Sequence, residues 1–150
     1  MRVIYRDIVG GFIFSNDGKL LLGKNRKGGV YEGLFTVPGG GVDDGETKEA
    51  ALRREMLEET GLDVSQAKIT VLGQSTGEHE KTLPATAERV LVKMNFFNYR
   101  IDLSQDAEDI ILITEDDWHQ PHWFGLNELK NISISSPARR VLVAGGLITA

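Results

Sequence analysis

The chain has 150 residues, a formal net charge of −5 at pH 7 and no cysteine. This length supports one domain with a single hydrophobic core, and 41% hydrophobic and 26% charged residues are typical of a globular protein. The missing cysteines exclude disulfides, zinc–cysteine sites and thiol nucleophiles, and the acidic balance argues against a nucleic-acid groove, which needs a basic face.

The first residues, MRVIYRDIVGG, are too polar for a signal peptide, and no stretch approaches the roughly 20 apolar residues of a membrane span. We therefore expect a cytoplasmic protein with no membrane partner. An acidic chain can take a phosphorylated substrate only where metal ions or a local basic patch offset the repulsion.

The first predicted element is a β-hairpin. The segment DIVGGFIFSNDGKLLLGKNR, residues 7–26, contains two apolar runs joined at 16–18 by Asn-Asp-Gly, a tight-turn signal. A short apolar strand follows at 34–37, and Pro38 and three glycines end it.

A helix of about 13 residues comes next, and the sequence marks both of its ends. Thr47 is a good N-cap because its hydroxyl can accept a hydrogen bond from the first turn. No proline interrupts the segment, and Gly61 lies where a left-handed C-terminal cap belongs.

The second half of the chain predicts further strands and a short helix. The segment RVLVKMNFFNYRI is the strongest strand because it is rich in Val, Phe and Tyr. The expected elements are strands at 67–74, 89–101 and 121–126, a polar loop at 75–88, and a C-terminal helix at 136–148 with Pro137 in its first turn. Mixed strands with two helices favour a compact α/β layer structure in one domain, residues 1–150.

The first helix carries a concentration of carboxylates. At about 100° per residue, Glu55, Glu58 and Glu59 fall within an arc of about 100°, and Arg54 lies four residues before Glu58. Such a face is usually solvated surface with a weak Arg–Glu pair. Converging carboxylate oxygens are also the ligands that Mg²⁺ prefers, and the ion would remove their repulsion. The glycine-rich turn ahead of the helix would let backbone atoms approach an ion or a phosphate.

The spacing of the charged residues favours the second interpretation. Gly40, Glu46 and the run REMLEETGL at 54–62 resemble the signature of the Nudix hydrolases, with every defined position filled. A chance match is on the order of 10⁻⁹ per start site at ordinary residue frequencies. The stretches LLLGKNR, VPGG and HWFGLNEL are also similar to the family's framework. The resemblance covers most of the chain and implies an α/β fold, a Nudix-type α/β/α sandwich with a mixed β-sheet and the signature as loop–helix–loop.

The resemblance implies hydrolysis of a nucleoside diphosphate linked to another group X, with Mg²⁺ or Mn²⁺ and attack of water on phosphorus. Glu55, Glu58 and Glu59 then correspond to the family's catalytic metal carboxylates, and the backbone carbonyl of Gly39 to a further metal ligand. Arg54 corresponds to the catalytic arginine that orients a glutamate of the signature.

The same resemblance gives two residues structural roles: Glu46 steadies the loop and Gly61 ends the helix. Gly40, at the start of the signature, is a candidate for substrate binding. Lys24 and Arg26 belong to a basic run ahead of it, which is either a solvated turn or a contact for substrate phosphate.

The resemblance leaves open which group takes the proton from water. Glu115, in the acidic run at 115–117, is the first candidate as an extra metal ligand or base, and a solvated acidic loop is the alternative. Glu78, Glu80 and Glu88 are weaker candidates in the polar loop.

The histidines and aromatic residues are less informative. His79 is expected to be exposed to solvent, and His119 and His122 are expected to be structural at a strand edge. Four aromatic residues could offer a base-stacking surface, although most aromatics of a small α/β domain are core: Phe12, Tyr31, Phe35 and Trp123.

The substrate is the least determined feature. Because the full glutamate set favours attack at phosphorus, our first expectation is a nucleoside triphosphate, including an oxidised deoxynucleotide, cleaved to monophosphate and pyrophosphate. The alternatives are a nucleotide-sugar pyrophosphatase or GDP-mannose-type hydrolase, and a non-catalytic module that senses a nucleotide. We expect a small-molecule nucleotide as partner and no nucleic-acid polymer, and the dimers common in the family leave a homodimer open.

Overall fold

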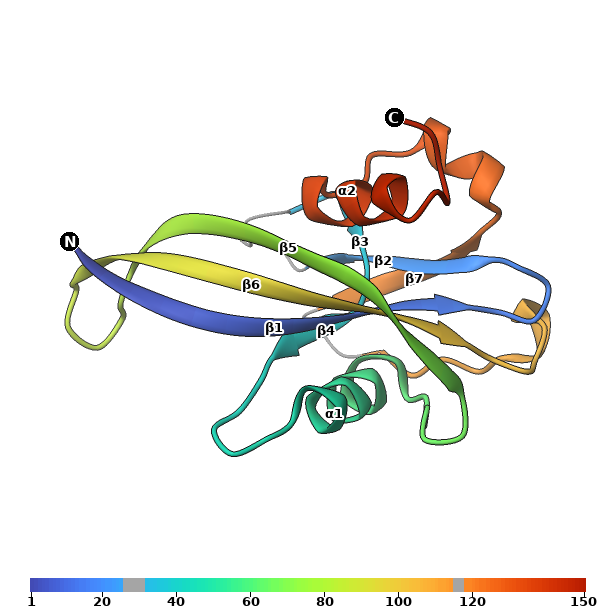
Figure 1. Ribbon diagram of the computed structural model, residues 1–150, viewed down its shortest axis with the longest axis horizontal. Coiled ribbons are helices and arrows are strands. Elements are labelled where there is room, and N and C mark those ends of the chain that lie inside the picture. Colours follow the sequence, from blue (N-terminus) through green and yellow to red (C-terminus); the bar gives the residue numbers. More distant parts are fainter. Residues whose placement is uncertain (26–31, 115–117) are drawn as a thin grey trace.

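The computed structural model describes residues 1–25, 32–114 and 118–150 and shows a mixed β-sheet between two α-helices (Figure 1). The strands are β1 (Arg2–Phe14), β2 (Leu20–Asn25), β3 (Phe35–Thr36), β4 (Gly39–Gly41), β5 (Lys68–Thr82), β6 (Arg89–Asp102) and β7 (Trp118–Phe124). The helices are α1 (Lys48–Thr60) and α2 (Ser136–Ala144), with short 3₁₀ turns η1 (Ala107–Asp109) and η2 (Leu126–Asn131). Neither α-helix in the described ranges has the length and apolar character needed to cross a membrane.

The sheet follows the order β3-β2-β1-β6-β5, with β4 added to β1 and β7 added to β2. Strands β1 and β6 are parallel along their whole length, from Arg2↔Val90 to Phe14↔Asp102. The other pairs are antiparallel. Helix α1 covers one face of the sheet and α2 the other (Figure 1). This arrangement confirms the predicted α/β sandwich with a mixed sheet.

Each helix closes a separate part of the hydrophobic core. Leu52 and Met56 of α1 are fully buried in a cluster with Val9 and Ile13 of β1. On the opposite face, the apolar residues of α2 pack against Phe12 and further residues of β1 and β2. Successive residues of β1 thus serve opposite layers, as the two-residue period of a strand requires.

The predicted ends of α1 are confirmed. The Thr47 hydroxyl accepts a hydrogen bond of 3.1 Å from the Ala50 N–H. Gly61 has a φ of 74°, and its N–H donates to the Leu57 carbonyl. The hairpin turn is also confirmed, because Gly18 has a φ of 80° and Ser15 N–H donates to Lys19 O at 2.9 Å.

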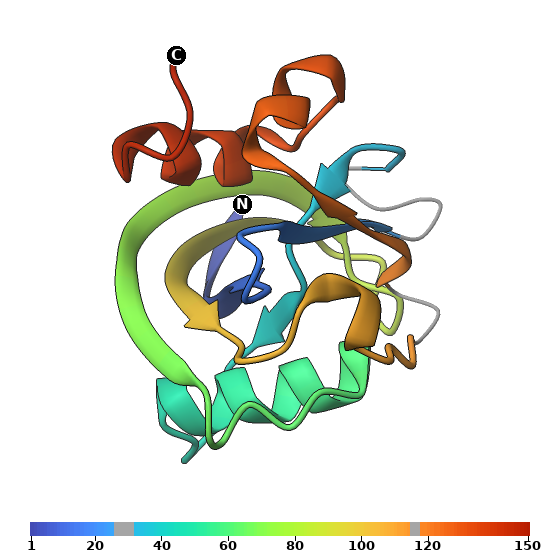
Figure 2. The same ribbon diagram turned by 90° about the vertical axis from the view of Figure 1, so that its right-hand side faces the viewer.

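The prediction of a loop at 75–88 is wrong over most of its length. Strand β5 continues to Thr82 and pairs with β6 as far as Thr82↔Arg89, which leaves only a short turn (Figure 2). Thr76, Glu78 and Glu80 lie exposed on one face of this edge strand. Their polarity therefore reflects solvent on that face, while one edge of the backbone pairs with β6.

Two other strands are longer than predicted. Strand β1 begins at Arg2, ahead of the apolar run, because its N-terminal half pairs with β6. Strand β7 begins at Trp118, three residues before Pro121, because it pairs with β2 as far as Asn25↔Trp118.

Replacing Leu52 by Ala should lower the free energy of unfolding by about 2–5 kcal/mol, because it leaves a cavity under α1. Leu57→Ala is the matched control on the same helix: Leu57 is 55% exposed, so the change should stay within about 0.5 kcal/mol. Urea unfolding followed by circular dichroism measures both values. Equal losses for the two variants would contradict the packing of α1 described above.

Candidate active site

Strand β4 consists of three glycines, and groups from both faces of the sheet approach its backbone. It pairs with β1 through Ile8↔Gly41, Val9↔Gly40 and Gly10↔Gly39. A Cβ on Gly40 would collide with the carboxylate of Glu55, which comes from α1. A Cβ on Gly41 would collide with the guanidinium of Arg6, which comes from β1. Side chains here would therefore push both charged groups away from the strand.

Arg54 connects the loop before α1 with the carboxylates on the helix. Its Nε and Nη2 donate to the two carboxylate oxygens of Glu46 at 2.8 and 3.0 Å. Its Nη2 also donates to the Gly41 carbonyl at 2.9 Å. Its Nη1 donates to Glu55 at 2.8 Å and to Glu58 at 3.3 Å. One guanidinium thus fixes β4, the loop and the helix relative to one another.

The contact between Arg54 and Glu46 shifts the pKa of both groups. Hydrogen bonds from Arg54, and then from the Asp43 N–H, lower the pKa of Glu46 to about 2. The hydrogen bond with Glu46 in turn raises the pKa of Arg54. Glu46 is therefore ionised throughout the neutral range and is a weaker base than an unpaired glutamate.

The three glutamates of the helix have different surroundings. The Glu55 side chain is only 12% exposed, and burial raises its pKa although Arg54 acts to lower it. The Glu58 side chain is 55% exposed. Glu59 accepts a hydrogen bond of 2.7 Å from the Gly39 N–H. Glu55 and Glu59 thus reach neighbouring residues of the same glycine strand.

These residues fit a hard divalent cation in their chemistry. Within the described ranges, no three His, Asp or Glu side chains already stand close enough together to hold a metal ion. Glu55 and Glu58 are turned toward Arg54, and Glu59 toward Gly39. Their oxygens are nevertheless the ligand type that Mg²⁺ prefers, and all three come from two turns of one helix. The donor set fits the ion, provided that the carboxylates turn toward one another.

The comparison with known proteins identifies the family. A family model described as a NUDIX domain matches residues 4–144. The chain belongs to the Nudix family. An RNA pyrophosphohydrolase of Rickettsia canadensis is 32% identical to it over 144 residues, which cover 92% of this chain and 84% of that protein.

Other relatives of this Nudix chain match over shorter stretches or by fold. An RNA pyrophosphohydrolase of Novosphingobium aromaticivorans is 37% identical over 82 residues, 53% of this chain and 48% of that protein. The match therefore spans about half the length of that relative. The E. coli dihydroneopterin triphosphate pyrophosphohydrolase superposes with a TM-score of 0.68 at 18% identity, covering 94% of this chain and 96% of that chain. At this identity the superposition shows the shared Nudix fold and no more.

The remaining site residues expected from the sequence lie on other elements than β4 or outside the described ranges. Arg26 and Glu115 lie outside the described residues. Lys24 lies on β2, and its Nζ is 5.0 Å from the centre of the Phe35 ring. Gly61 caps α1 as expected, and a Cβ at this position would crowd Ile113.

The histidine predictions are confirmed only in part. His119 and His122 lie on β7, which pairs with β2, in agreement with a place in a strand. His79 lies on β5 opposite Val92 and is half-buried, so the expected exposure to solvent is wrong. Its Nδ1 is buried and has no hydrogen-bond partner among the described residues.

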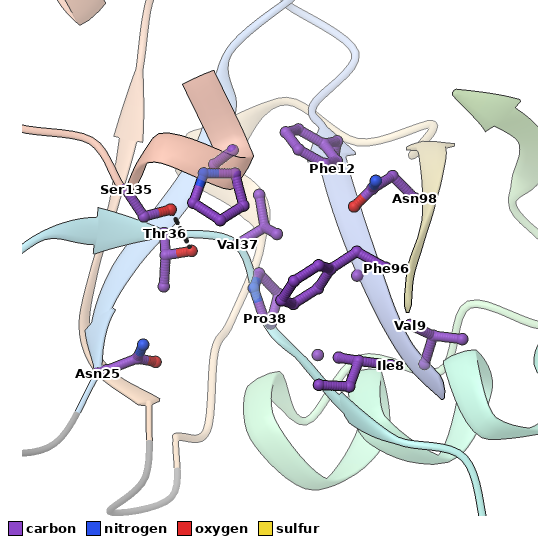
Figure 3. A pocket seen from close by; sticks show the side chains of 14 residues that line it. Ile8, Val9, Phe12, Asn25, Thr36, Val37, Pro38, Phe96, Asn98 and Ser135 are labelled. Carbon is purple, nitrogen blue, oxygen red and sulfur yellow. Dashed lines mark hydrogen bonds between the residues drawn. The ribbon is translucent and has the colours of Figure 1, made fainter. Parts of the chain in front are cut away.

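The sequence reading missed two residues near the glycine strand. The Arg6 side chain makes no hydrogen bond or ion pair with the residues that the structure describes, and it is exposed beside Gly41. Asn98 of β6 lines a cavity that also reaches Gly39 (Figure 3). Neither residue belongs to a motif, and only the pairing of β1 with β4 and β6 brings them to this region.

Replacing Glu46 by Gln should change the response of stability to acid. Because the pKa of Glu46 is lowered from 4.5 to about 2, its ion pair contributes stability above pH 4.5 that is lost as the pH falls toward 2. The variant should melt at a lower temperature at pH 7 and lose less on acidification to pH 2. Melting temperatures across this range test the prediction, with exposed Glu49→Gln as the control. Parallel acid profiles for wild type and Glu46→Gln would contradict it.

Proposed function

We propose that the chain hydrolyses a pyrophosphate bond of a nucleotide, with a nucleoside triphosphate as substrate and with a monophosphate and pyrophosphate as products. The observation that carries the proposal is the convergence of Glu55 and Glu59 on β4. Glu59 binds the Gly39 N–H at 2.7 Å, and Glu55 lies against Gly40. Family membership supports the reaction class, and the intact glutamate set supports attack at phosphorus.

Glu55, Glu58 and Glu59 are the proposed holders of Mg²⁺ or Mn²⁺, with the Gly39 carbonyl as a further ligand. A divalent cation bound there would screen the charge of the pyrophosphate and make the attacking water more acidic. Glu55 is buried and bonded to Arg54 in this structure, so cation binding requires its carboxylate to turn toward Glu58 and Glu59.

The reaction at phosphorus requires a proton acceptor and a leaving group. The water oxygen forms the new bond to phosphorus, and the bridging oxygen of the anhydride departs with its phosphate. The proton from water passes to a carboxylate. The candidates are Glu55 and Glu59 of α1, and Glu115, which lies outside the described residues. Glu46 is unsuited because its lowered pKa makes it a weak base.

Arg6 is proposed to bind substrate phosphate. Its guanidinium lies over Gly41, on the side of β4 opposite to Glu55. Ile8, the next residue on the same face of β1, lines the cavity in Figure 3. An exposed cation without a partner among the described residues can offset part of the repulsion between an acidic protein and a phosphate chain.

RNA is the second candidate substrate. The relative that matches 92% of this chain is named an RNA pyrophosphohydrolase. This observation weighs against our expectation that no nucleic-acid polymer takes part. RNA carrying a 5′-triphosphate therefore belongs in the same substrate panel as free nucleotides.

Phosphate and pyrophosphate release with Mg²⁺ tests the function. The panel contains common and oxidised nucleoside triphosphates, nucleotide sugars and 5′-triphosphorylated RNA. Glu59→Gln keeps an oxygen for the Gly39 N–H but removes the charge, so the rate should fall roughly 10²- to 10⁴-fold. Glu49→Gln on the exposed side of the same helix should keep the wild-type rate. Chelation by EDTA should abolish turnover, and Mg²⁺ should restore it.

Four outcomes separate the candidates. Pyrophosphate from free triphosphates supports the first proposal, and release from RNA alone replaces it with the second. Turnover that Glu59→Gln leaves unchanged would remove Glu59 from the reaction. Absence of turnover with every substrate would leave a nucleotide-sensing module.

Replacing Arg6 by Gln should raise the KM for a triphosphate about tenfold and leave kcat nearly unchanged, because a charge-assisted phosphate contact is lost in ground and transition states alike. Arg2→Gln is the matched control, since Arg2 lies on the same strand and is paired with Glu88 at 2.9 Å. Initial rates at several ionic strengths measure both variants. An equal effect of the two substitutions would show that only the overall charge matters.

A further inference from the structure

Part of the sheet extends beyond both helices. It consists of the first halves of β1 and β6 and the second half of β5 (Figure 1). On the α2 side, the helix packs near Leu72, and Arg140 of α2 donates to the Thr76 carbonyl at 3.4 Å. Beyond Thr76, this side of the sheet is a face that no described helix covers.

The strand register determines which side chains share this face. Residues opposite one another on neighbouring strands point to the same side of a sheet. Three rows across β1, β6 and β5 run from the N-terminus of β1 toward β4: Arg2 with Val90 and Lys81, Ile4 with Val92 and His79, and Arg6 with Met94 and Gly77. The middle residue of each row is apolar and buried. Cationic side chains thus flank an apolar floor.

The charges on this face are positive. Arg2, Arg6 and Lys81 are exposed, and no position of the three rows is Asp or Glu. Glu88, in the turn between β5 and β6, pairs with Arg2 at 2.9 Å and offsets part of its charge. The acidic residues of the same strand segments lie on the opposite face: Asp7, Glu78 and Glu80. The net charge of −5 therefore does not describe this face, which attracts anions.

The cationic face is continuous with the candidate active site. Arg6 lies over Gly41, beside the proposed position of the substrate phosphates. Four residues of β1 separate Arg6 from Arg2, a distance of about 13 Å, and Lys81 lies two strands across from Arg2, about 10 Å away. A free nucleotide has no phosphate left for Lys81 once its phosphate chain occupies the carboxylate cluster. Each further nucleotide of an RNA chain adds one.

We propose that this face binds the backbone of an RNA that follows a 5′-triphosphate, with Arg6 at the reacting phosphates and Lys81 at a phosphate of a later nucleotide. The inference rests on RNA as the second candidate substrate of the proposed function. His79 is half-buried in the middle row, and its ring offers a surface on which a base can stack. Backbone contacts position a nucleic acid without reading its sequence, so 5′ ends of different sequence would be accepted.

Binding of 5′-monophosphorylated RNA tests this surface without turnover, because these molecules carry the product end of the proposed reaction. Fluorescence anisotropy at constant Mg²⁺ measures the affinity for chains of one, two, four and six nucleotides. The affinity should rise up to four nucleotides and then level off, because the cationic face ends at the row of Arg2 and Lys81. In a plot of log affinity against log salt, each phosphate contacted should contribute about −0.7 to the slope.

Lys81→Gln should reduce the size of this salt slope by about 0.7 for the four-nucleotide chain and weaken its binding about fivefold at low salt. Binding of a nucleoside monophosphate should not change. Lys93→Gln is the matched control: Lys93 is exposed on β6, and its register with Tyr5 and Glu78 places it on the opposite face. The control should keep the wild-type affinity and slope. Melting temperatures show that both variants are folded.

The outcomes distinguish this inference from the proposed function. Equal affinity for one and four nucleotides, or equal losses in Lys81→Gln and Lys93→Gln, would overturn the inference even if free triphosphates are hydrolysed. An acidic peptide of the same charge that binds as tightly as the RNA would overturn the assignment to RNA. Length-dependent binding that Lys81→Gln reduces, in a protein without turnover, would support the RNA-binding face while the hydrolytic proposal fails.

Discussion

The positive charge of Arg54 offsets the repulsion among several carboxylates, and the other groups of the candidate site are positioned by their contacts with it. Its guanidinium binds Glu46 through two hydrogen bonds and reaches Glu55 and Glu58 on its own helix. The same group binds the Gly41 carbonyl. Arginine suits this position because its planar donors serve several acceptors at once and remain charged at every relevant pH. The loop, β4 and α1 therefore have one common anchor.

The candidate site also requires glycine along β4, because charged side chains approach the strand from both faces. The groups on its two faces must approach a backbone that carries no Cβ. Glu55 uses the face toward α1, and Arg6 uses the opposite face. Because β4 also pairs with β1, its position is set by the centre of the sheet. The carboxylate of Glu55 and the guanidinium of Arg6 therefore lie on opposite faces of β4.

The parts of the fold that were predicted correctly are those that depend on residues close together in the sequence. Thr47 and Gly61 mark the ends of α1 because caps depend on residues within one turn. The loop predicted at 75–88 failed because an edge strand with one solvated face has a polar composition. The homodimer stays a prediction, as do the roles of Arg26 and Glu115, which lie outside the described residues.

The sequence by itself determined the family and the helix that carries the proposed site. The spacing of Arg54, Glu55, Glu58 and Glu59 is enough to predict that they lie close together, because residues three and four apart share a helix face. Only the tertiary structure decided what faces them across β4. Arg6 and Asn98 come from strands far from the helix in the chain, and their places depend on the pairing of β1 with β4 and β6. Strand pairing is set by burial and long-range hydrogen bonds, which no short stretch of sequence encodes.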